Sequence, residues 1–255
     1  MHKCLLITVA LLVCPVDGKV VSPKEIFEQN QSAVVRIFVN GNLSGCGFIV
    51  SEDGVVVTAN HVVVGADESK GGIMVERFGN TKQVPATLTD HSESTDTALL
   101  QIPGGRGFKH TYFGDTKSLE ISEAVAVVTF WPSGKTPILL TGIISGIAVG
   151  NTQGMVFQMP VRKGYSGSPI FNSHGQVVGI VTTRLVGITE DLNQTKQAAL
   201  AQGDGEGISI DGINVVKTFG NLISAYELDL ISGMGTAVSS SYAEEMIQKT
   251  KQPKK

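Results

Sequence analysis

A serine set between glycines is the residue of this sequence best suited to covalent chemistry. Ser166 lies in the run Gly164-Tyr165-Ser166-Gly167-Ser168-Pro169. Glycine adopts backbone conformations that a side chain would block, so N–H groups of such a turn can point at a developing oxyanion. A serine hydroxyl is a weak nucleophile alone, because it needs a general base, and that base needs an orienting acid. We therefore look upstream for a histidine and a carboxylate.

His61 and Asp96 are the candidates for these two roles. His61 directly follows the apolar run 55–58, and Asp96 directly precedes the apolar run 97–102. A lone histidine beside a strand is more often structural, and aspartate most often serves as a turn or cap residue. The order His61, Asp96, Ser166 is nevertheless that of chymotrypsin-like enzymes and differs from that of α/β-hydrolases and subtilisins. The combination predicts a nucleophilic triad.

Other residues of the same types fit these roles less well. Asp90 is the alternative acid, but it lacks a following Ala-Leu-Leu run. His91, His110 and His174 lie in polar, loop-like contexts and are expected to face solvent. No spacing of metal ligands appears, so neither a metal nor a cofactor is expected.

Composition and strand pattern indicate the fold class. The chain has 255 residues, with 42% hydrophobic residues, 17% charged residues and 30 glycines, as in a globular, turn-rich protein. Short apolar runs between turns such as Asn40-Gly41 predict antiparallel barrels or a sandwich. The expected strands are 33–39, 47–50, 55–58, 73–78, 83–89, 97–102, 124–129, 138–145, 155–158, 176–182 and 235–238. A net charge of −3 gives no reason to expect nucleic acid as a partner.

Helices are expected at both ends and in one insertion. Ser22 and Pro23 have the residue types of a helix cap and a first helical position. The segments 190–200 and 215–226 are helix-prone, and a closing helix is expected at 239–249.

The first 18 residues have the pattern of a signal peptide. A basic start precedes the apolar run 4–13, which is too short to span a bilayer comfortably. Cleavage is expected before Lys19, and a lipid anchor on Cys14 is the weaker alternative. The mature protein is then exported, to the periplasm or the extracellular space, without stable membrane insertion. Cys46 remains as its single cysteine, so no intrachain disulfide is expected, and Cys46 is interpreted as a small buried residue.

Three segments around the candidate triad form specific motifs: 58–63 (Thr-Ala-Asn-His-Val-Val), 96–100 (Asp-Thr-Ala-Leu-Leu) and 164–169 (Gly-Tyr-Ser-Gly-Ser-Pro). Together they resemble the motifs of trypsin-like serine peptidases, closest to the bacterial HtrA/Deg branch. The resemblance covers about 33–238. It implies an all-β, chymotrypsin-like fold of two perpendicular six-stranded antiparallel β-barrels, with the triad in the cleft between them and a C-terminal helix.

The resemblance also implies a role for each residue. His61 is the implied general base, Asp96 orients its imidazole, and Ser166 is the implied nucleophile. The backbone N–H groups of Gly164 and Ser166 would form the oxyanion hole. The implied activity is that of a serine endopeptidase that cleaves proteins or peptides through an acyl-enzyme. A catalytically silent or latent relative that binds peptides or partners in its cleft is the alternative.

The substrate pocket is implied by alignment to the nucleophile. Pro160 is expected to line one side of the primary pocket, and Thr182, Thr183 and Arg184 the other. No aspartate lies at the expected pocket base, which argues against Lys or Arg as the preferred residue and leaves small or medium apolar residues as the default.

The sequence departs from some relatives. Tyr165 stands where pancreatic zymogens carry an aspartate that receives a new N-terminus, so that activation route is not expected. HtrA-type proteins usually carry a PDZ domain after the barrels, and the residues after Val238 are too few for one. Relatives often form trimers, so a homo-oligomer stays open.

The expected domain plan has four parts. It consists of a signal peptide at 1–18, an N-terminal segment at 19–32, a peptidase domain at 33–245 and a basic flexible tail at 246–255. The insertion at about 188–229 is longer than these strands require. It is expected to be either a lid over the cleft or a surface excursion.

Overall fold

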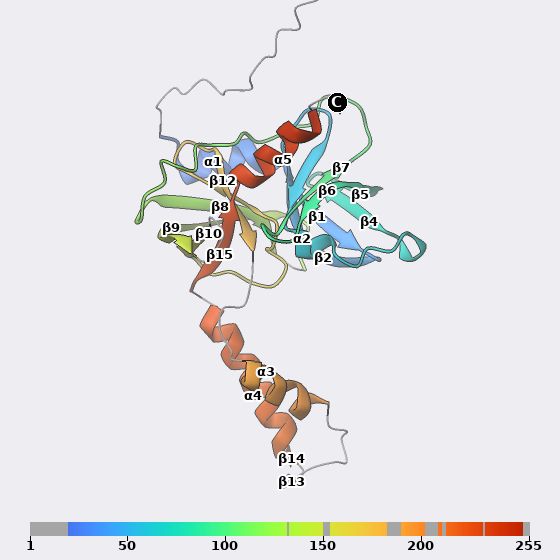
Figure 1. Ribbon diagram of the computed structural model, residues 1–255, viewed down its shortest axis with the longest axis vertical. Helices are drawn as coiled ribbons and strands as arrows, with labels where there is room; N and C mark the ends of the chain where they lie inside the picture. The colour runs from blue at the N-terminus through green and yellow to red at the C-terminus, as the bar shows by residue number, and fades with distance from the viewer. Residues whose placement is uncertain are drawn as a thin grey trace, which may run out of the picture.

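Two β units lie side by side in the computed structural model of the protein (Figure 1). The structure describes residues 20–131, 133–149, 154–182, 190–201, 209–210, 213–231 and 233–251. The expected signal peptide at 1–18 lies outside these residues.

The N-terminal unit is one antiparallel sheet of seven strands in the order β5-β4-β1-β2-β3-β7-β6. β1 and β2 are joined at Asn40 and Gly41, whose φ angles of 52° and 81° suit a tight hairpin turn. The strands are β1 (Val34–Val39), β2 (Asn42–Ile49), β3 (Val55–Thr58), β4 (Ile73–Arg77), β5 (Asn80–Pro85), β6 (Thr87–Ser92) and β7 (Thr97–Gln101). The expected strand at 83–89 is divided at Ala86, because the residues before it pair with β4 and those after it pair with β7.

The C-terminal unit is a closed antiparallel barrel in the order β10-β15-β12-β11-β8-β9. Its strands are β8 (Ala124–Phe130), β9 (Pro137–Val149), β10 (Gly154–Gln158), β11 (Pro169–Phe171), β12 (Val177–Thr182) and β15 (Gly235–Ser239). Apolar side chains such as Val127, Phe157 and Ile170 fill its interior. The expected chymotrypsin-like fold of two β units is confirmed, with seven strands instead of six in the first unit.

Helices cover the outside of the two units. α1 (Pro23–Asn30) begins at the expected cap, where Glu25 N–H donates to Ser22 Oγ at 3.2 Å and Ser22 N–H donates to Glu25 Oε2 at 2.8 Å. α5 (Ser241–Lys251) closes the chain and buries Met246. Regular structure therefore continues beyond residue 245, and the expected start of a flexible tail at 246 is wrong, because α5 has an apolar face to pack.

The insertion is a helical hairpin. α3 (Glu190–Leu200) packs on α4 (Val215–Ile231), beside the short pair β13 (Ser209–Ile210) and β14 (Ile213–Asn214). Figure 1 shows the hairpin extending away from the barrels, so a surface excursion describes it better than a lid. Among the residues that the structure describes, no helix has the length and apolar character needed to cross a membrane.

Arg36, one partner of a buried ion pair within the N-terminal sheet, also binds the other unit. Arg36 of β1 and Glu76 of β4 have side chains that are 8% and 7% exposed, and Arg36 Nη2 lies 2.5 Å from Glu76 Oε1. Arg36 Nη1 also donates to Gly134 O, in the β8–β9 loop of the other unit, at 3.1 Å. Removing one partner of such a pair leaves an uncompensated buried charge.

The two units also approach closely where the loop before β11 passes β2. Gly167 has a φ of 84°, and a Cβ there would lie 2.0 Å from Cys46 O and 2.3 Å from Thr58 Oγ1. On the other side of the contact, a Cβ on Gly45 would lie 2.8 Å from Ser166 O. Neither position has room for a side chain, so glycine is required by the close approach.

Replacing Glu76 by alanine is expected to lower the free energy of unfolding by roughly 3–5 kcal/mol, because Arg36 would stay buried without its partner. Urea unfolding measures the change. Glu28→Ala is the matched control, since Glu28 pairs with Lys24 at 3.8 Å in an exposed position, and it should cost no more than about 1 kcal/mol. Equal losses in the two variants would contradict a structural role for the buried pair.

Gly167→Ala and Gly41→Ala separate the cost of a left-handed backbone from the cost of the contact. Gly41 has a φ of 81° and no atom within 4 Å of an added Cβ, so its replacement should cost roughly 1–2 kcal/mol of unfolding free energy. Gly167→Ala should cost roughly 1–3 kcal/mol more, because the backbones must separate. Chemical denaturation of both variants measures this difference. Similar losses of unfolding free energy in the two variants would contradict an added cost from the backbone contact.

Candidate active site

The structure brings His61 and Asp96 into direct contact. His61 lies on α2 (Asn60–Val63), the single turn that follows β3, and Asp96 lies in the turn before β7. His61 Nδ1 is 2.8 Å from Asp96 Oδ2, and His61 N–H donates to Asp96 Oδ1 at 2.9 Å. An ionised carboxylate only accepts hydrogen bonds, so when the imidazole is neutral this contact favours the tautomer with the proton on Nδ1 and a lone pair on Nε2. This arrangement suits a general base.

Burial differs sharply between the two side chains. The Asp96 side chain is 5% exposed, whereas that of His61 is 43% exposed. Asp96 has a φ of 47°, and its carbonyl accepts from Asn60 N–H at 3.1 Å. A non-glycine residue in this region is uncommon and persists when its surroundings determine it. Asp96 is thus fixed in the protein, while the imidazole reaches solvent.

Ser166 lies on two successive tight turns. Tyr165 N–H donates to Arg162 O at 3.1 Å, and Ser168 N–H donates to Tyr165 O at 3.1 Å. The third residue of each turn is a glycine with positive φ, 99° at Gly164 and 84° at Gly167, as type II turns require. Tyr165 is 2% exposed and packs into the core of the C-terminal barrel. We call residues 162–168 the nucleophile turn.

The nucleophile turn lies next to α2, the helical turn that carries His61, and β2 lies between them. Cys46 N–H donates to Ser166 O at 2.8 Å. A Cβ placed on the neighbouring Gly45 would lie 2.8 Å from both Ser166 O and Val62 Cγ2, so this glycine lies between the turn and α2. The structure therefore gathers His61, Asp96 and Ser166 at the junction of the two units.

The alternative residues lie elsewhere. Asp90 is in β6, where its Oδ1 accepts from His91 N–H at 2.9 Å. His91 and His174 are exposed, and His110 is half-buried with its ring 5.0 Å from that of Tyr112. Within the described residues, no group of three or more His, Cys, Asp or Glu side chains could hold a metal ion.

Only part of the expected substrate pocket can be placed. Pro160 is exposed in the loop after β10. Thr182 is buried at the end of β12, and its carbonyl accepts a hydrogen bond from the Thr236 hydroxyl. Thr183 and Arg184 lie outside the described residues.

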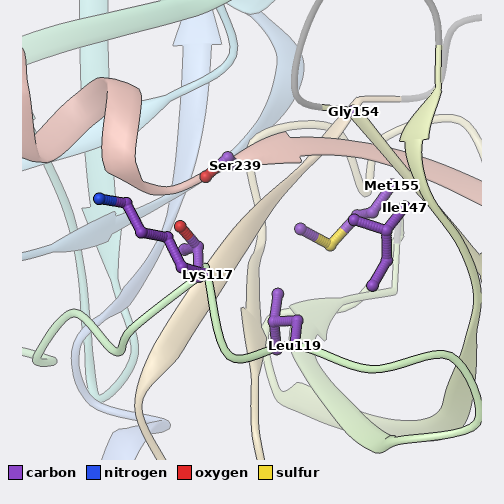
Figure 2. A pocket seen from close by; sticks show the side chains of 7 residues that line it. Lys117, Leu119, Ile147, Gly154, Met155 and Ser239 are labelled. Carbon is purple, nitrogen blue, oxygen red and sulfur yellow. The ribbon is translucent and has the colours of Figure 1, made fainter.

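A cavity of about 330 Å³ opens on the C-terminal barrel at another place (Figure 2). Its apolar part is formed by Leu119, Ile147 and Met155, and the Lys117 side chain lies at one side of it. Thr116, Gly154 and Ser239 complete the lining. None of the candidate triad residues lines this cavity, so the candidate chemistry takes place outside it.

Three buried polar side chains lie behind the nucleophile turn. Ser168 Oγ donates to Thr129 Oγ1 at 2.7 Å, Thr129 Oγ1 lies 3.6 Å from Cys46 Sγ, and Cys46 Sγ donates to Gly164 O at 3.3 Å. Burial raises the pKa of the Cys46 thiol. Cys46 was expected to be a small buried packing residue, and Thr129 had no expected role. A hydroxyl within the apolar run 124–130 was the available signal.

The amino-acid sequence of the chain matches a known protein family. Residues 45–180 match the model of the trypsin-like peptidase domain. A probable periplasmic serine endoprotease, DegP-like, of Pseudomonas putida is 35% identical over 141 residues, and its counterpart in Hahella chejuensis is 33% identical over 142. These matches cover 53% and 54% of this chain, but only 28% and 29% of the relatives.

Among solved structures, an HtrA-type protease AlgW with decapeptide aligns with a TM-score of 0.62. The alignment covers 89% of this chain and 67% of that one, at 18% sequence identity, and therefore supports the fold. The family match extends over more than half of the chain and includes His61, Asp96 and the nucleophile turn. The chain belongs to the trypsin-like peptidase family.

Proposed function

We propose that the protein is an exported serine endopeptidase of the HtrA/DegP type. The observation that carries this proposal is the 2.8 Å contact between Asp96 and His61 at the junction where the nucleophile turn holds Ser166. In the proposed roles, Ser166 is the nucleophile, His61 the general base and Asp96 the acid that orients and stabilises the imidazolium. These roles agree with the family match.

The proposed reaction has two halves. His61 Nε2 takes the proton of Ser166 Oγ as this oxygen bonds to the scissile carbonyl carbon, and the imidazolium then gives the proton to the leaving amine. The C–N bond breaks and an acyl-enzyme remains. Water, deprotonated by His61, attacks the ester carbonyl, and the proton returns to Ser166 Oγ as the acid product leaves.

The proposed oxyanion hole consists of the backbone N–H groups of Gly164 and Ser166. The positive φ of Gly164 and the hydrogen bond from Tyr165 N–H to Arg162 O support this assignment, because they hold the peptide units of the turn in fixed directions. Loss of one such donor typically raises the barrier by roughly 2.7–4 kcal/mol.

Substrate and location follow from the relatives and from the sequence. The relatives are named as periplasmic endoproteases, and residues 1–18 have the pattern of a signal peptide. We therefore propose export and cleavage of proteins or peptides. The primary pocket is proposed to lie between Pro160 and the segment 182–184, and to accept small or medium apolar residues.

Labelling with a fluorophosphonate tests the nucleophile. Wild-type protein that begins at Lys19 should be labelled, and Ser166→Ala should not, because the probe phosphonylates an activated serine. Ser173→Ala, which removes a serine hydroxyl in the turn after β11 and outside the nucleophile turn, should label like the wild type. An unlabelled but folded wild type would favour the silent or latent alternative.

Asp96→Asn tests the orienting acid. An amide in place of the carboxylate favours the wrong imidazole tautomer, so kcat should fall by about 10⁴-fold. Hydrolysis of an unfolded protein substrate measures this change. Asp90→Asn provides the control, and its kcat should equal that of the wild type. A larger loss in Asp90→Asn than in Asp96→Asn would reverse the assignment of the acid.

A further inference from the structure

Cys46 holds the nucleophile turn through both its backbone and its side chain. Its N–H donates to Ser166 O at 2.8 Å, and its thiol donates to Gly164 O at 3.3 Å. The residue is 1% exposed, and its own carbonyl accepts from Thr58 Oγ1 at 2.7 Å. Cys46 therefore belongs rigidly to the N-terminal sheet while it binds two carbonyls of the other unit.

The direction of the hydrogen bonds behind the turn is determined by the number of hydrogens. Ser168 donates its hydroxyl hydrogen to Thr129 Oγ1, which leaves the Thr129 hydrogen for Cys46 Sγ at 3.6 Å. The Cys46 hydrogen is then directed at Gly164 O, since a thiol has one hydrogen to donate. This order requires a neutral thiol, and burial raises the pKa of Cys46, which favours that form.

The peptide unit between Gly164 and Tyr165 is thus held at both ends. The Cys46 thiol binds its carbonyl, and Arg162 O accepts from its N–H at 3.1 Å. Gly164 has no Cβ to restrict its backbone, so contacts from outside the residue must determine its conformation. The Gly164 N–H and the Ser166 N–H belong to the peptide units directly before and after this one, so fixing it anchors the backbone between the two N–H groups.

We propose that Cys46 is a positioning residue for the oxyanion hole: its thiol, oriented by Thr129 and Ser168, holds the Gly164 carbonyl and thereby directs the Gly164 and Ser166 N–H groups at the substrate oxygen. This inference rests on the proposed peptidase function. It assigns to a neutral, buried cysteine a role in transition-state stabilisation, without contact with the substrate.

Three variants separate this role from simple packing. Cys46→Ala should lower kcat by roughly 2- to 10-fold, the effect of one neutral hydrogen bond, with KM unchanged. Cys46→Ser should restore kcat to within about twofold of the wild type, because a hydroxyl can donate to the same carbonyl. Ser240→Ala is the matched control: it removes a buried hydroxyl that donates to Val177 O at 2.9 Å, so it should lower stability but leave kcat unchanged.

A spectroscopic measurement gives a readout that is independent of turnover. The infrared S–H band of Cys46, isolated as the difference between wild type and Cys46→Ser, should lie at lower frequency in the folded than in the urea-unfolded protein, because the thiol donates a hydrogen bond. Equal frequencies, an unchanged kcat in Cys46→Ala, or equal losses in the alanine and serine variants would each overturn the proposal. An inactive wild type would instead contradict the proposed function, and the S–H band would still decide whether the thiol binds the turn.

Discussion

The close contact between β2 and the nucleophile turn is the constraint on which the candidate active site depends. Gly45 and Gly167 leave no space for side chains on either side of it, and Cys46 N–H bonds directly to Ser166 O across it. His61 and Asp96 belong to the N-terminal sheet, whereas Ser166 leads into the C-terminal barrel. The three side chains can therefore meet only when the two units are docked at this distance.

The junction of the two units contains both buried charged groups and buried neutral polar groups. Away from the candidate triad, Arg36 forms a buried ion pair with Glu76 in its own sheet and also donates to Gly134 O in the β8–β9 loop of the other unit. Behind the nucleophile turn, the polar groups are neutral and linked in one direction from Ser168 to Gly164. A neutral chain supplies a dipole without placing a fixed charge beside the proposed oxyanion hole, where a negative charge would oppose the proposed reaction.

Local features were predictable because they depend on neighbouring residues. The Asn40-Gly41 turn, the Ser22 cap and most strand positions follow from short patterns, and the candidate triad was proposed from motifs and their order. Contacts between distant elements were not predictable in this way. Arg36 contacts Glu76 in β4 and Gly134 in the other unit, and Thr129 contacts Cys46. These contacts depend on the arrangement of both sheets. No local pattern distinguishes such partners from ordinary polar residues.

The helical hairpin enters and leaves the barrel at one rung of its ladder, since Thr182 of β12 pairs with Thr236 of β15. The barrel itself holds these two ends together, and the entropic cost of a longer connection rises only slowly with its length, by about 0.6 kcal/mol for each doubling. The connection between Thr182 and Thr236 is therefore a place where the sequence can be lengthened, shortened or exchanged during evolution while the barrel persists. Because Thr182 also borders the proposed primary pocket, such changes are expected to alter which substrates the pocket accepts, while the residues of the candidate triad stay the same.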